Sequence, residues 1–337
     1  MNQTILILYR EVMGYTVAGI QQLVKVTNAD VIVIEDTISK LIPFQFKLEG
    51  VKYKSKEDFN SKDALKKYCI SLNAKLVLCS GWLDQDYLAI CKEYLTSGTK
   101  TVCMFDTQWH GSFRQYIASW ASSMYLKKHF TFMWGSGMRQ FEFAKRMGYS
   151  SDKIKIGFYT CDYNLYKTVE NNYDSRNILF IGRFVKEKGI DRLIESFNIL
   201  RESFPTWTLT LVGNGKLDYG KLNSQIIVKE FKQPFELVNE FSRASIFCLP
   251  SLYEPWGVVL HEAAVAGLPI LCSYECGASD SFVRDGYNGL KFEKNMTDKL
   301  KYLMEKTPNQ LREFGDNSRK LGHDFNPQIW AETILAF

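Results

Sequence analysis

Two glutamates spaced eight residues apart lie in the most chemically suggestive part of the sequence. Glu254 precedes Pro255-Trp256-Gly257, and Glu262 follows in a segment with helical spacing. The apolar run at 244–250 is typical of a buried strand, so Glu254 is predicted in a strand-to-helix loop and Glu262 in the second helical turn. Taken alone, such a pair is more often a coincidence of a helix-start charge and an unrelated carboxylate.

The first turn of that helix changes this interpretation. The backbone N–H groups of Gly257, Val258 and Val259 lack helical partners, and with the helix dipole they attract an anion such as a phosphate. A carboxylate is repelled by phosphate but is a strong acceptor for hydroxyl groups. Phosphate-binding amides flanked by two carboxylates indicate a ligand that carries both groups, as a nucleotide sugar does.

A second chemically capable segment lies about 70 residues upstream, at 181–189. Gly182 permits an unusual turn after a strand, and Arg183 and Lys188 can converge on one spot. The planar guanidinium of Arg183 can hold two phosphate oxygens, while Lys188 supplies a point charge. A solvated basic turn explains this segment equally well on its own, because acidic and basic residues alternate in it.

Length and element order indicate the scaffold that must position these groups. A chain of 337 residues suits two domains, and its 46% hydrophobic content allows a sizeable core. Alternating strands and helices predict an α/β fold with parallel sheets and crossover helices. We predict two Rossmann-like domains facing each other across a cleft, at 1–170 and 171–323, with a helix at 324–337 that packs back toward the first domain.

The expected elements follow the apolar periodicity. In the first half we expect strands at 4–8, 29–35, 76–79, 101–105 and 131–134, and helices at 16–26, 63–72, 84–95, 113–128 and 138–147. In the second half we expect strands at 177–181, 207–212, 226–231, 244–250 and 269–272, and helices at 190–203, 235–244 and after Gly257. Residues 43–60 are lysine-rich and are expected to form an extended insertion.

Several classes of protein fit the sequence poorly. The net charge of +5 comes without a basic-aromatic motif, so we expect no nucleic-acid partner. The eight cysteines are scattered and are expected to be free thiols in a reducing cytoplasm. Asp84-Gln85-Asp86 spells a metal-binding D-x-D, but a helix N-cap explains it, so we expect no metal and no cofactor. There is no dinucleotide or P-loop motif, no membrane-spanning run and no signal-peptide pattern.

The stretch at 254–269, E-P-W-G-V-V-L-H-E-A-A-V-A-G-L-P, resembles the E-x7-E signature of retaining GT-B glycosyltransferases of glycosyltransferase family 4 (group 1). Residues 182–189, G-R-F-V-K-E-K-G, resemble the G-R-x-x-x-x-K-G motif of that family, and 212–215 resemble its V-G-x-G. The resemblance covers the chain from about residue 150 onward; the N-terminal half resembles the family only in layout. It implies the GT-B architecture.

The resemblance also implies roles for matching residues. Arg183 and Lys188 would bind the donor diphosphate, Glu254 the hydroxyls of the donor sugar, and Glu262 the ribose. Phe231 would border the nucleobase, although the glycine common there is missing. The donor-site positions other than Glu262 are Gly14, Gly182, Phe231, Trp256, Gly257, Val258 and Val259.

The acceptor side departs from the family pattern. Many relatives carry His-Asp at the end of the strand near position 105, whereas this chain has Phe105-Asp106 and a later histidine, His110. Either Asp106 keeps the place near the anomeric carbon, or His110 substitutes for the missing histidine as a catalytic residue. Gly14 resembles the glycine at which the acceptor domain approaches the donor, and a plain turn glycine explains it equally well.

The implied reaction is a retaining, metal-independent sugar transfer from a nucleotide-diphosphate sugar, with UDP favoured over GDP. The acceptor would be a glycan or a lipid-linked glycan in cell-surface polysaccharide synthesis. A donor phosphate oxygen would take the acceptor proton, so no protein base is required. The rival interpretations are a GT-B-type sugar-nucleotide epimerase and a catalytically silent partner subunit; the presence of both glutamates and both cations disfavours the second.

Peripheral membrane contact is a separate question. The segment 113–128 mixes aromatic residues with terminal lysines, as interfacial helices do. The same pattern fits a domain helix packed on its sheet, which we favour. Residues 1–170 hold 22 Lys and Arg against 16 Asp and Glu, which is compatible with an anionic membrane surface, at the inner face of the cell membrane, or with an anionic acceptor.

Overall fold

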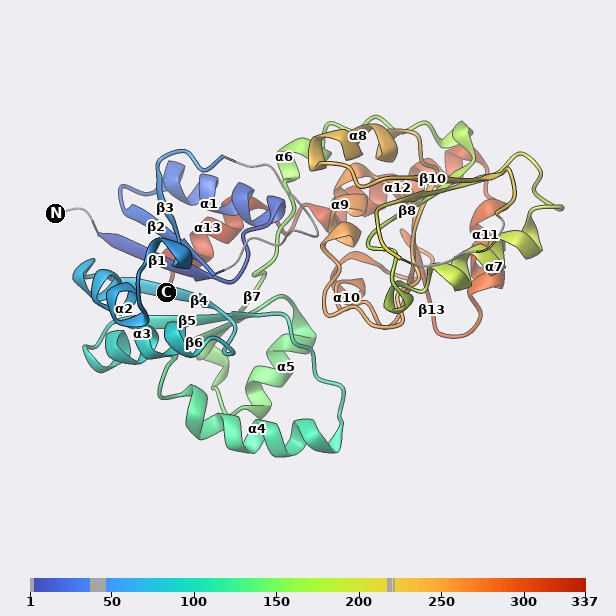
Figure 1. Cartoon of the computed structure of the whole chain (residues 1–337). Coiled ribbons are helices and arrows are strands. Elements are labelled where there is room, and N and C mark those ends of the chain that lie inside the picture. Colours follow the sequence, from blue (N-terminus) through green and yellow to red (C-terminus); the bar gives the residue numbers. More distant parts are fainter. Residues whose placement is uncertain (1–2, 37–46, 217–219, 221) are drawn as a thin grey trace. The chain divides into compact units, whose positions relative to one another are not determined.

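The computed structural model describes residues 3–36, 47–216, 220 and 222–337. The chain divides into two compact units, described separately below (Figure 1). The N-terminal unit comprises Met1–Thr160 and Pro327–Phe337, and the C-terminal unit comprises Cys161–Asn326. The change of unit therefore lies about ten residues before the boundary at 170 that the polar stretch suggested, and the last helix is part of the N-terminal unit.

In the described part of the N-terminal unit, seven parallel strands form one sheet in the order β3-β2-β1-β4-β5-β6-β7. The strands are β1 (Thr4–Tyr9), β2 (Asp30–Glu35), β3 (Val51–Ser55), β4 (Leu76–Ser80), β5 (Lys100–Phe105), β6 (Phe132–Gly135) and β7 (Ile154–Ile156). The helices are α1 (Gly14–Val26), α2 (Lys62–Ser71), α3 (Gln85–Thr96), α4 (Phe113–Leu126), α5 (Met138–Arg146) and α13 (Pro327–Leu335). This strand–helix alternation confirms the predicted parallel sheet with crossover helices.

The sheet of the N-terminal unit is buried on both faces, which explains its continuous apolar strands. Successive residues of β1 enter different core clusters, with Leu6 and Leu8 on one face and Ile5 and Ile7 on the other. The second cluster also contains Trp330 of α13, whose indole N–H donates to the carbonyl of Phe158 at 2.8 Å.

The C-terminal unit contains a second parallel sheet, whose six strands in the described residues run β10-β9-β8-β11-β12-β13. The strands are β8 (Asn177–Ile181), β9 (Thr208–Val212), β10 (Ile226–Lys229), β11 (Ile246–Leu249), β12 (Ile270–Ser273) and β13 (Gly289–Phe292). The helices are α6 (Tyr163–Tyr166), α7 (Ile190–Leu200), α8 (Pro234–Ser242), α9 (Val258–Ala266), α10 (Ser279–Phe282), α11 (Met296–Met304) and α12 (Pro308–Gly322).

Three strands were missed by the sequence prediction: β3, β7 and β13, the last of which (Gly289–Phe292) lies in the segment after 272 where only a loop and helices were expected. β3 lies within the segment 43–60 that was expected to be an insertion, of which 43–46 are outside the described residues. The lysines of β3 made the segment look like a polar loop in the sequence. In the structure, Val51-Lys52-Tyr53-Lys54 is a charged edge strand that pairs with β2 on one side only. β7 has three residues, too short for a periodic signal.

Both sheets reverse their strand order once, and each reversal creates a place for a ligand. The neighbours at the reversal are β1 and β4 in the N-terminal unit and β8 and β11 in the C-terminal unit. In open parallel sheets, ligands bind beyond the carboxyl ends of the strands at such a point. The segments after Tyr9, Ser80, Ile181 and Leu249 are therefore the places to look for function.

Candidate functional site

The two motif segments of the C-terminal unit meet at its strand-order reversal. β8 and β11 pair directly, with Ile178 opposite Ile246 and Leu179 opposite Phe247. In this register, the residues after Ile181 and Leu249 emerge side by side at the carboxyl edge. The sheet therefore brings together residues 182–189 and 250–257, which are far apart in the sequence.

Backbone contacts lock these two loops together. Glu187 lies in the short 3-10 turn Lys186–Lys188, and its carbonyl accepts hydrogen bonds from the N–H groups of Leu252 at 2.8 Å and Tyr253 at 3.3 Å. Gly189 has φ of +61°, and a Cβ there would lie 2.2 Å from the carbonyl oxygen of Pro250. Only glycine fits this position, because a side chain would push the loops apart.

The V-G-N-G segment at 212–215 contacts the loop at 182–189 from the side of β9. Phe184 donates its N–H to the carbonyl of Asn214 at 2.6 Å. Gly213 has φ of +152°, and a Cβ there would lie 1.9 Å from the carbonyl oxygen of Gly182. The three motif segments thus form one contiguous set of loops.

Lys188 and Glu254 form an ion pair across these loops. Both side chains are largely shielded, with 16% and 11% of their surface accessible, so the pair lies in a poorly hydrated place. In its ionised form the Glu254 carboxylate is a hydrogen-bond acceptor only, so it can accept hydrogen bonds from hydroxyl groups. The pairing holds a cation and a hydroxyl acceptor next to each other.

Arg183 has a different environment. Its side chain is exposed, and within the described ranges it forms no hydrogen bond or ion pair of its own. With the charge of Lys188 balanced by Glu254, the guanidinium leaves the loop set with one excess positive charge. A dianionic or trianionic phosphate group is the ligand that such a set would attract.

Gly257 shapes the start of α9. It is the N-cap residue with φ of +93°, and a Cβ would lie 3.0 Å from Cγ of Glu254. No side chain caps this helix, so the N–H groups of its first turn, at Val258 and Val259, are available to a ligand. The helix predicted to begin here starts at Val258, and its binding of an anion stays a prediction.

Glu262 lies one turn further along α9 and is partly buried. Burial raises the pKa of its carboxyl group from the ordinary value of 4.5 to about 7; the hydroxyl of Tyr166 lowers it, and the charge of Asp162 raises it further. A carboxyl group poised near neutrality at a ligand site is characteristic of functional residues.

The remaining predicted donor residues of this unit have distinct places. Gly182 is partly buried directly after β8. The side chain of Trp256 is only 2% exposed and packs near Phe282 and Phe325, so only its backbone can face a ligand. Phe231 is partly buried in the loop after β10, which ends at Lys229 rather than at the predicted residue 231.

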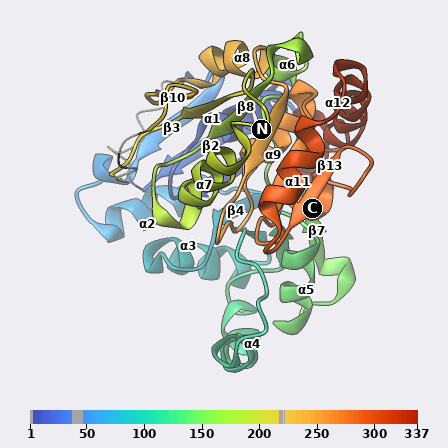
Figure 2. The same ribbon diagram turned by 90° about the vertical axis from the view of Figure 1, so that its right-hand side faces the viewer.

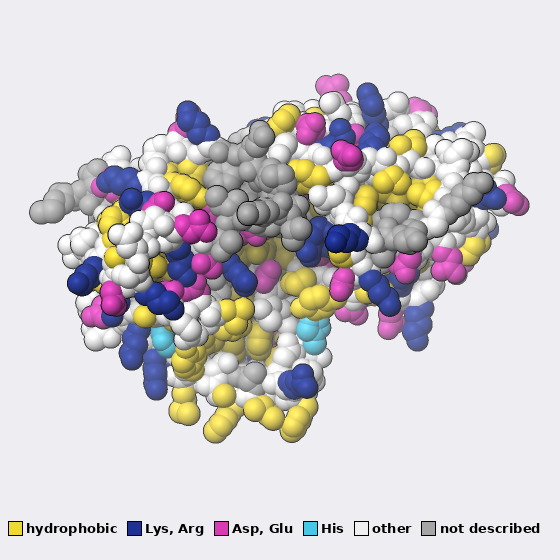
Figure 3. Space-filling view, in the orientation of Figure 1, with side chains coloured by type: hydrophobic (Ala, Val, Ile, Leu, Met, Phe, Trp, Pro, Cys, Tyr) yellow, Lys and Arg dark blue, Asp and Glu magenta, His cyan; other side chains and the backbone are white. Residues whose placement is uncertain are grey.

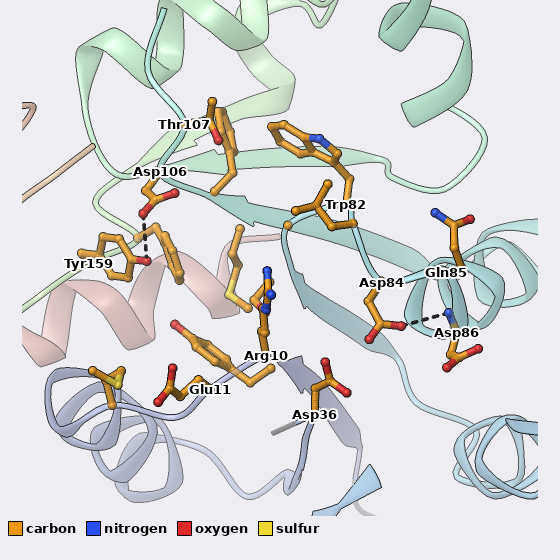
Figure 4. A pocket seen from close by; sticks show the side chains of 18 of the residues that line it. Arg10, Glu11, Asp36, Trp82, Asp84, Gln85, Asp86, Asp106, Thr107 and Tyr159 are labelled. Atoms are coloured by element: carbon orange, nitrogen blue, oxygen red, sulfur yellow. Dashed lines mark hydrogen bonds between the residues drawn. The ribbon is translucent and has the colours of Figure 1, made fainter. Parts of the chain in front are cut away.

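A pocket of about 860 Å³ lies at the strand-order reversal of the N-terminal unit (Figure 4). Aromatic side chains form part of its wall, including Trp82 after β4 and the edge-to-face pair Tyr15 and Tyr159, whose ring centroids are 5.1 Å apart. Asp106, directly after β5, accepts a hydrogen bond from the Tyr159 hydroxyl at 3.4 Å. Aromatic faces beside carboxylates are suited to a ligand that has both C–H faces and hydroxyl groups.

The opposite wall of this pocket is acidic. Asp36, Asp84 and Asp86 line it, and all three pair with Lys56. Burial lowers the pKa of Lys56, but its bonds to Asp84 and Asp36 outweigh burial and the pKa is raised. Asp84 also caps α3 by accepting from the N–H groups of Asp86 and Tyr87, which confirms the predicted N-cap.

The three predicted acceptor-side residues are not equivalent in the structure. Asp106 faces the pocket, whereas His110 is exposed in the loop before α4 and is not part of the pocket wall. The N–H of His110 donates to Oε1 of Gln115 at 2.7 Å. Gly14 is the first residue of α1, one residue after the pocket residue Met13.

The sequence analysis did not identify several residues that surround the predicted site residues. Tyr166 and Asp162, which act on Glu262, come from α6 and its N-cap, about 100 residues upstream. His261 also went unnoticed: it is buried and stacked on Phe282 at 4.4 Å, and burial lowers its pKa to about 4. In the N-terminal unit, the position of Trp82 after a predicted strand was the one available signal.

Two further features concern metals and membranes. Within residues 3–36, 47–216, 220 and 222–337, no group of three or more His, Cys, Asp or Glu residues is arranged to hold a metal ion. None of the helices in the described part of the chain combines the length and apolar character that a bilayer crossing requires.

Comparisons with known proteins relate part of this chain to glycosyltransferases. Residues 165–321 match the family of glycosyl transferases group 1. The chain is 30% identical over 168 residues to an uncharacterised glycosyltransferase of Methanocaldococcus jannaschii, covering 47% of this chain and 45% of that protein. It is 28% identical over 202 residues to the capsular polysaccharide biosynthesis glycosyltransferase CapM of Staphylococcus aureus, covering 56% and 52% of the two chains.

Among solved structures, Anabaena HepE in complex with UDP superposes with a TM-score of 0.76 at 14% identity over 99% of both chains. The two parallel sheets and this similarity define an α/β protein with the two-domain GT-B fold. By the family match, residues 165–321 are similar to the glycosyl transferases of group 1. The matching segment spans about half the length of these curated relatives, 45% and 52%.

Proposed function

We propose that the protein is a retaining, metal-independent hexosyltransferase that moves a sugar from a nucleotide-diphosphate sugar to a hydroxyl group of a glycan or lipid-linked acceptor. One observation carries the proposal. The loops after β8, β9 and β11 gather Arg183, the Lys188–Glu254 pair and the start of α9 at the strand-order reversal of the C-terminal unit. Cations, amides and carboxylates there match the phosphates and hydroxyls of one ligand.

Each group has a defined task in this proposal. Arg183, Lys188 and the amides of Val258 and Val259 neutralise the charge that develops on the leaving diphosphate as the sugar–oxygen bond breaks. Glu254, held in place by Lys188, accepts bonds from the sugar hydroxyls. Glu262 accepts bonds from the ribose hydroxyls in its ionised form.

The proton balance needs no protein base. The acceptor oxygen forms the new bond to the anomeric carbon on the face from which the diphosphate departs, and a phosphate oxygen takes the acceptor proton. The configuration is therefore retained. The positive groups around the phosphate stabilise both the broken bond and this transfer.

The pocket of the N-terminal unit supports a transferase over an epimerase, because epimerisation requires no acceptor. Its aromatic and acidic wall suits a glycan acceptor, with Asp106 rather than His110 beside the reacting hydroxyl. A UDP-sugar is the favoured donor, since UDP occupies the similarly folded HepE. The similarity to CapM, a capsular polysaccharide biosynthesis glycosyltransferase, supports a place in polysaccharide synthesis.

A thermal-shift screen of nucleoside diphosphates and their sugars tests the proposal, because ligands that bind the folded chain raise its melting temperature. We expect a rise with UDP and a UDP-hexose, which persists in EDTA and is absent in Arg183→Ala. The anomeric configuration of the product, read by NMR, then tests retention. No rise with any nucleoside diphosphate would overturn the proposal.

A further inference from the structure

The outer face of α4 carries a stripe of large apolar side chains. Phe113 is 78% exposed, Trp120 74%, Met124 66%, and Tyr116 and Ile117 55% each. Their spacing of three and four residues places them on one side of the helix. The expectation that this face packs on the sheet is therefore wrong.

The helix is held to its unit by a small part of its surface. Among its described side chains only Ser119 and Leu126 are buried, and Tyr116 touches Trp109 edge to face at 4.8 Å. Figures 1 and 2 show α4 at the margin of the N-terminal unit, outside its sheet. Apolar side chains project along this margin in Figure 3.

The charge around α4 is strongly positive. Residues 107–156 hold eight Lys and Arg against two Asp and Glu, whereas the rest of 1–170 holds fourteen of each. The whole charge excess of the N-terminal half thus lies in the fifty residues that contain α4. The helix itself has no acidic residue, and exposed Arg114, Lys127 and Lys128 flank the stripe.

We propose that α4 docks the protein on an anionic lipid bilayer, lying in the interface with its apolar stripe among the acyl chains. The stripe from Phe113 to Met124 is about 16 Å long at about 1.5 Å per residue, long enough for a helix parallel to the surface. Tryptophan and tyrosine are favoured at this depth, and the basic flanks attract anionic headgroups.

A second copy of this chain fits the surface less well. A symmetric dimer through α4 would place two copies of the same positively charged region against each other, and like charges oppose such contact. An anionic bilayer satisfies the stripe and the charge together.

Vesicle sedimentation of the full chain tests the proposal. We expect the protein to pellet with vesicles of phosphatidylcholine and phosphatidylglycerol, and to stay in the supernatant with phosphatidylcholine alone or in high salt. The double variant Phe113→Ser with Trp120→Ser should lower the bound-to-free ratio at least about tenfold. Arg114→Glu with Lys128→Glu should do the same.

Matched controls come from the C-terminal unit. Ile199→Ser with Phe235→Ser removes two apolar side chains that are 62% and 65% exposed, and Lys294→Glu with Lys301→Glu reverses two exposed charges. Both control pairs should bind vesicles as the original chain does. Equal loss in a control pair, or no pelleting of the original chain with anionic vesicles, overturns the proposal.

A spectroscopic arm locates the contact without relying on a loss of binding. Lipids brominated on their acyl chains should quench the tryptophan fluorescence of the original chain. Trp120→Phe keeps an aromatic ring, so this variant should bind but lose most of the quenching. Binding without quenching in the original chain, or light scattering that shows an α4-dependent dimer, overturns the membrane assignment.

Discussion

Replacing Glu262 by glutamine should stabilise the ligand-free protein and weaken its nucleotide binding. Burial raises the pKa of this carboxyl group from 4.5 to about 7, so the folded chain holds the proton more tightly than the unfolded chain does. The stability linked to this proton is fully present below pH 4.5 and is lost as pH rises to about 7. Glutamine is neutral at every pH and escapes this loss.

The size of the effect follows from the pKa. A rise from 4.5 to about 7 corresponds to at most about 3 kcal/mol of unfolding free energy at alkaline pH. Glu262→Gln should therefore unfold with a free energy higher than that of the original chain by about 3 kcal/mol near pH 8, but by only about 1 kcal/mol near pH 5. Other titrating groups cancel, because both chains contain them.

Urea denaturation of both chains at the two pH values measures this difference. Calorimetry with UDP should at the same time show weaker binding by the glutamine variant, since a neutral amide is a poorer acceptor for ribose hydroxyls. Glu305→Gln on an exposed surface serves as the matched control and should change neither quantity. An equal stability difference at both pH values, or a variant less stable near pH 8, would refute a raised pKa of the carboxyl group at this position.

Three further changes test other parts of the site. Arg183→Ala should abolish transfer without shifting the unfolding midpoint, because the side chain is exposed. Lys188→Ala should abolish transfer and also lower the unfolding free energy by about 3 kcal/mol, because shielded Glu254 loses its cation. Equal unfolding midpoints in the two variants would contradict the ion pair. Gly189→Ala should lower the unfolding free energy by at least about 2 kcal/mol. Gly286 has a similar positive φ but open space around it, so Gly286→Ala should lower the unfolding free energy by about half as much. Equal losses in urea unfolding would contradict the close contact between position 189 and Pro250. Asp106→Asn should lower the transfer rate about hundredfold and His110→Ala should leave it nearly unchanged, and the reverse order in a donor-consumption assay would assign the acceptor side to His110.

Much of the fold could be predicted because neighbours along the chain determine it. The apolar run at 177–181 is β8 in the structure, and each of the other predicted strands overlaps an observed one. β3 was missed because its alternating lysines suit an edge strand that only pairing with β2 reveals. Likewise, Arg183, Lys188, Glu254 and the start of α9 were identified from local motifs that follow strands.

The sequence by itself determined which side chains stand at the ends of parallel strands, and therefore which chemistry the C-terminal unit can offer. Only the tertiary structure decided that Lys188 pairs with Glu254 across 66 residues, that Tyr166 and Asp162 act on Glu262, and that the aromatic face of α4 meets solvent. The physical reason is that periodicity depends on residues within a few turns, whereas ion pairing, pKa and burial depend on segments that only folding brings together.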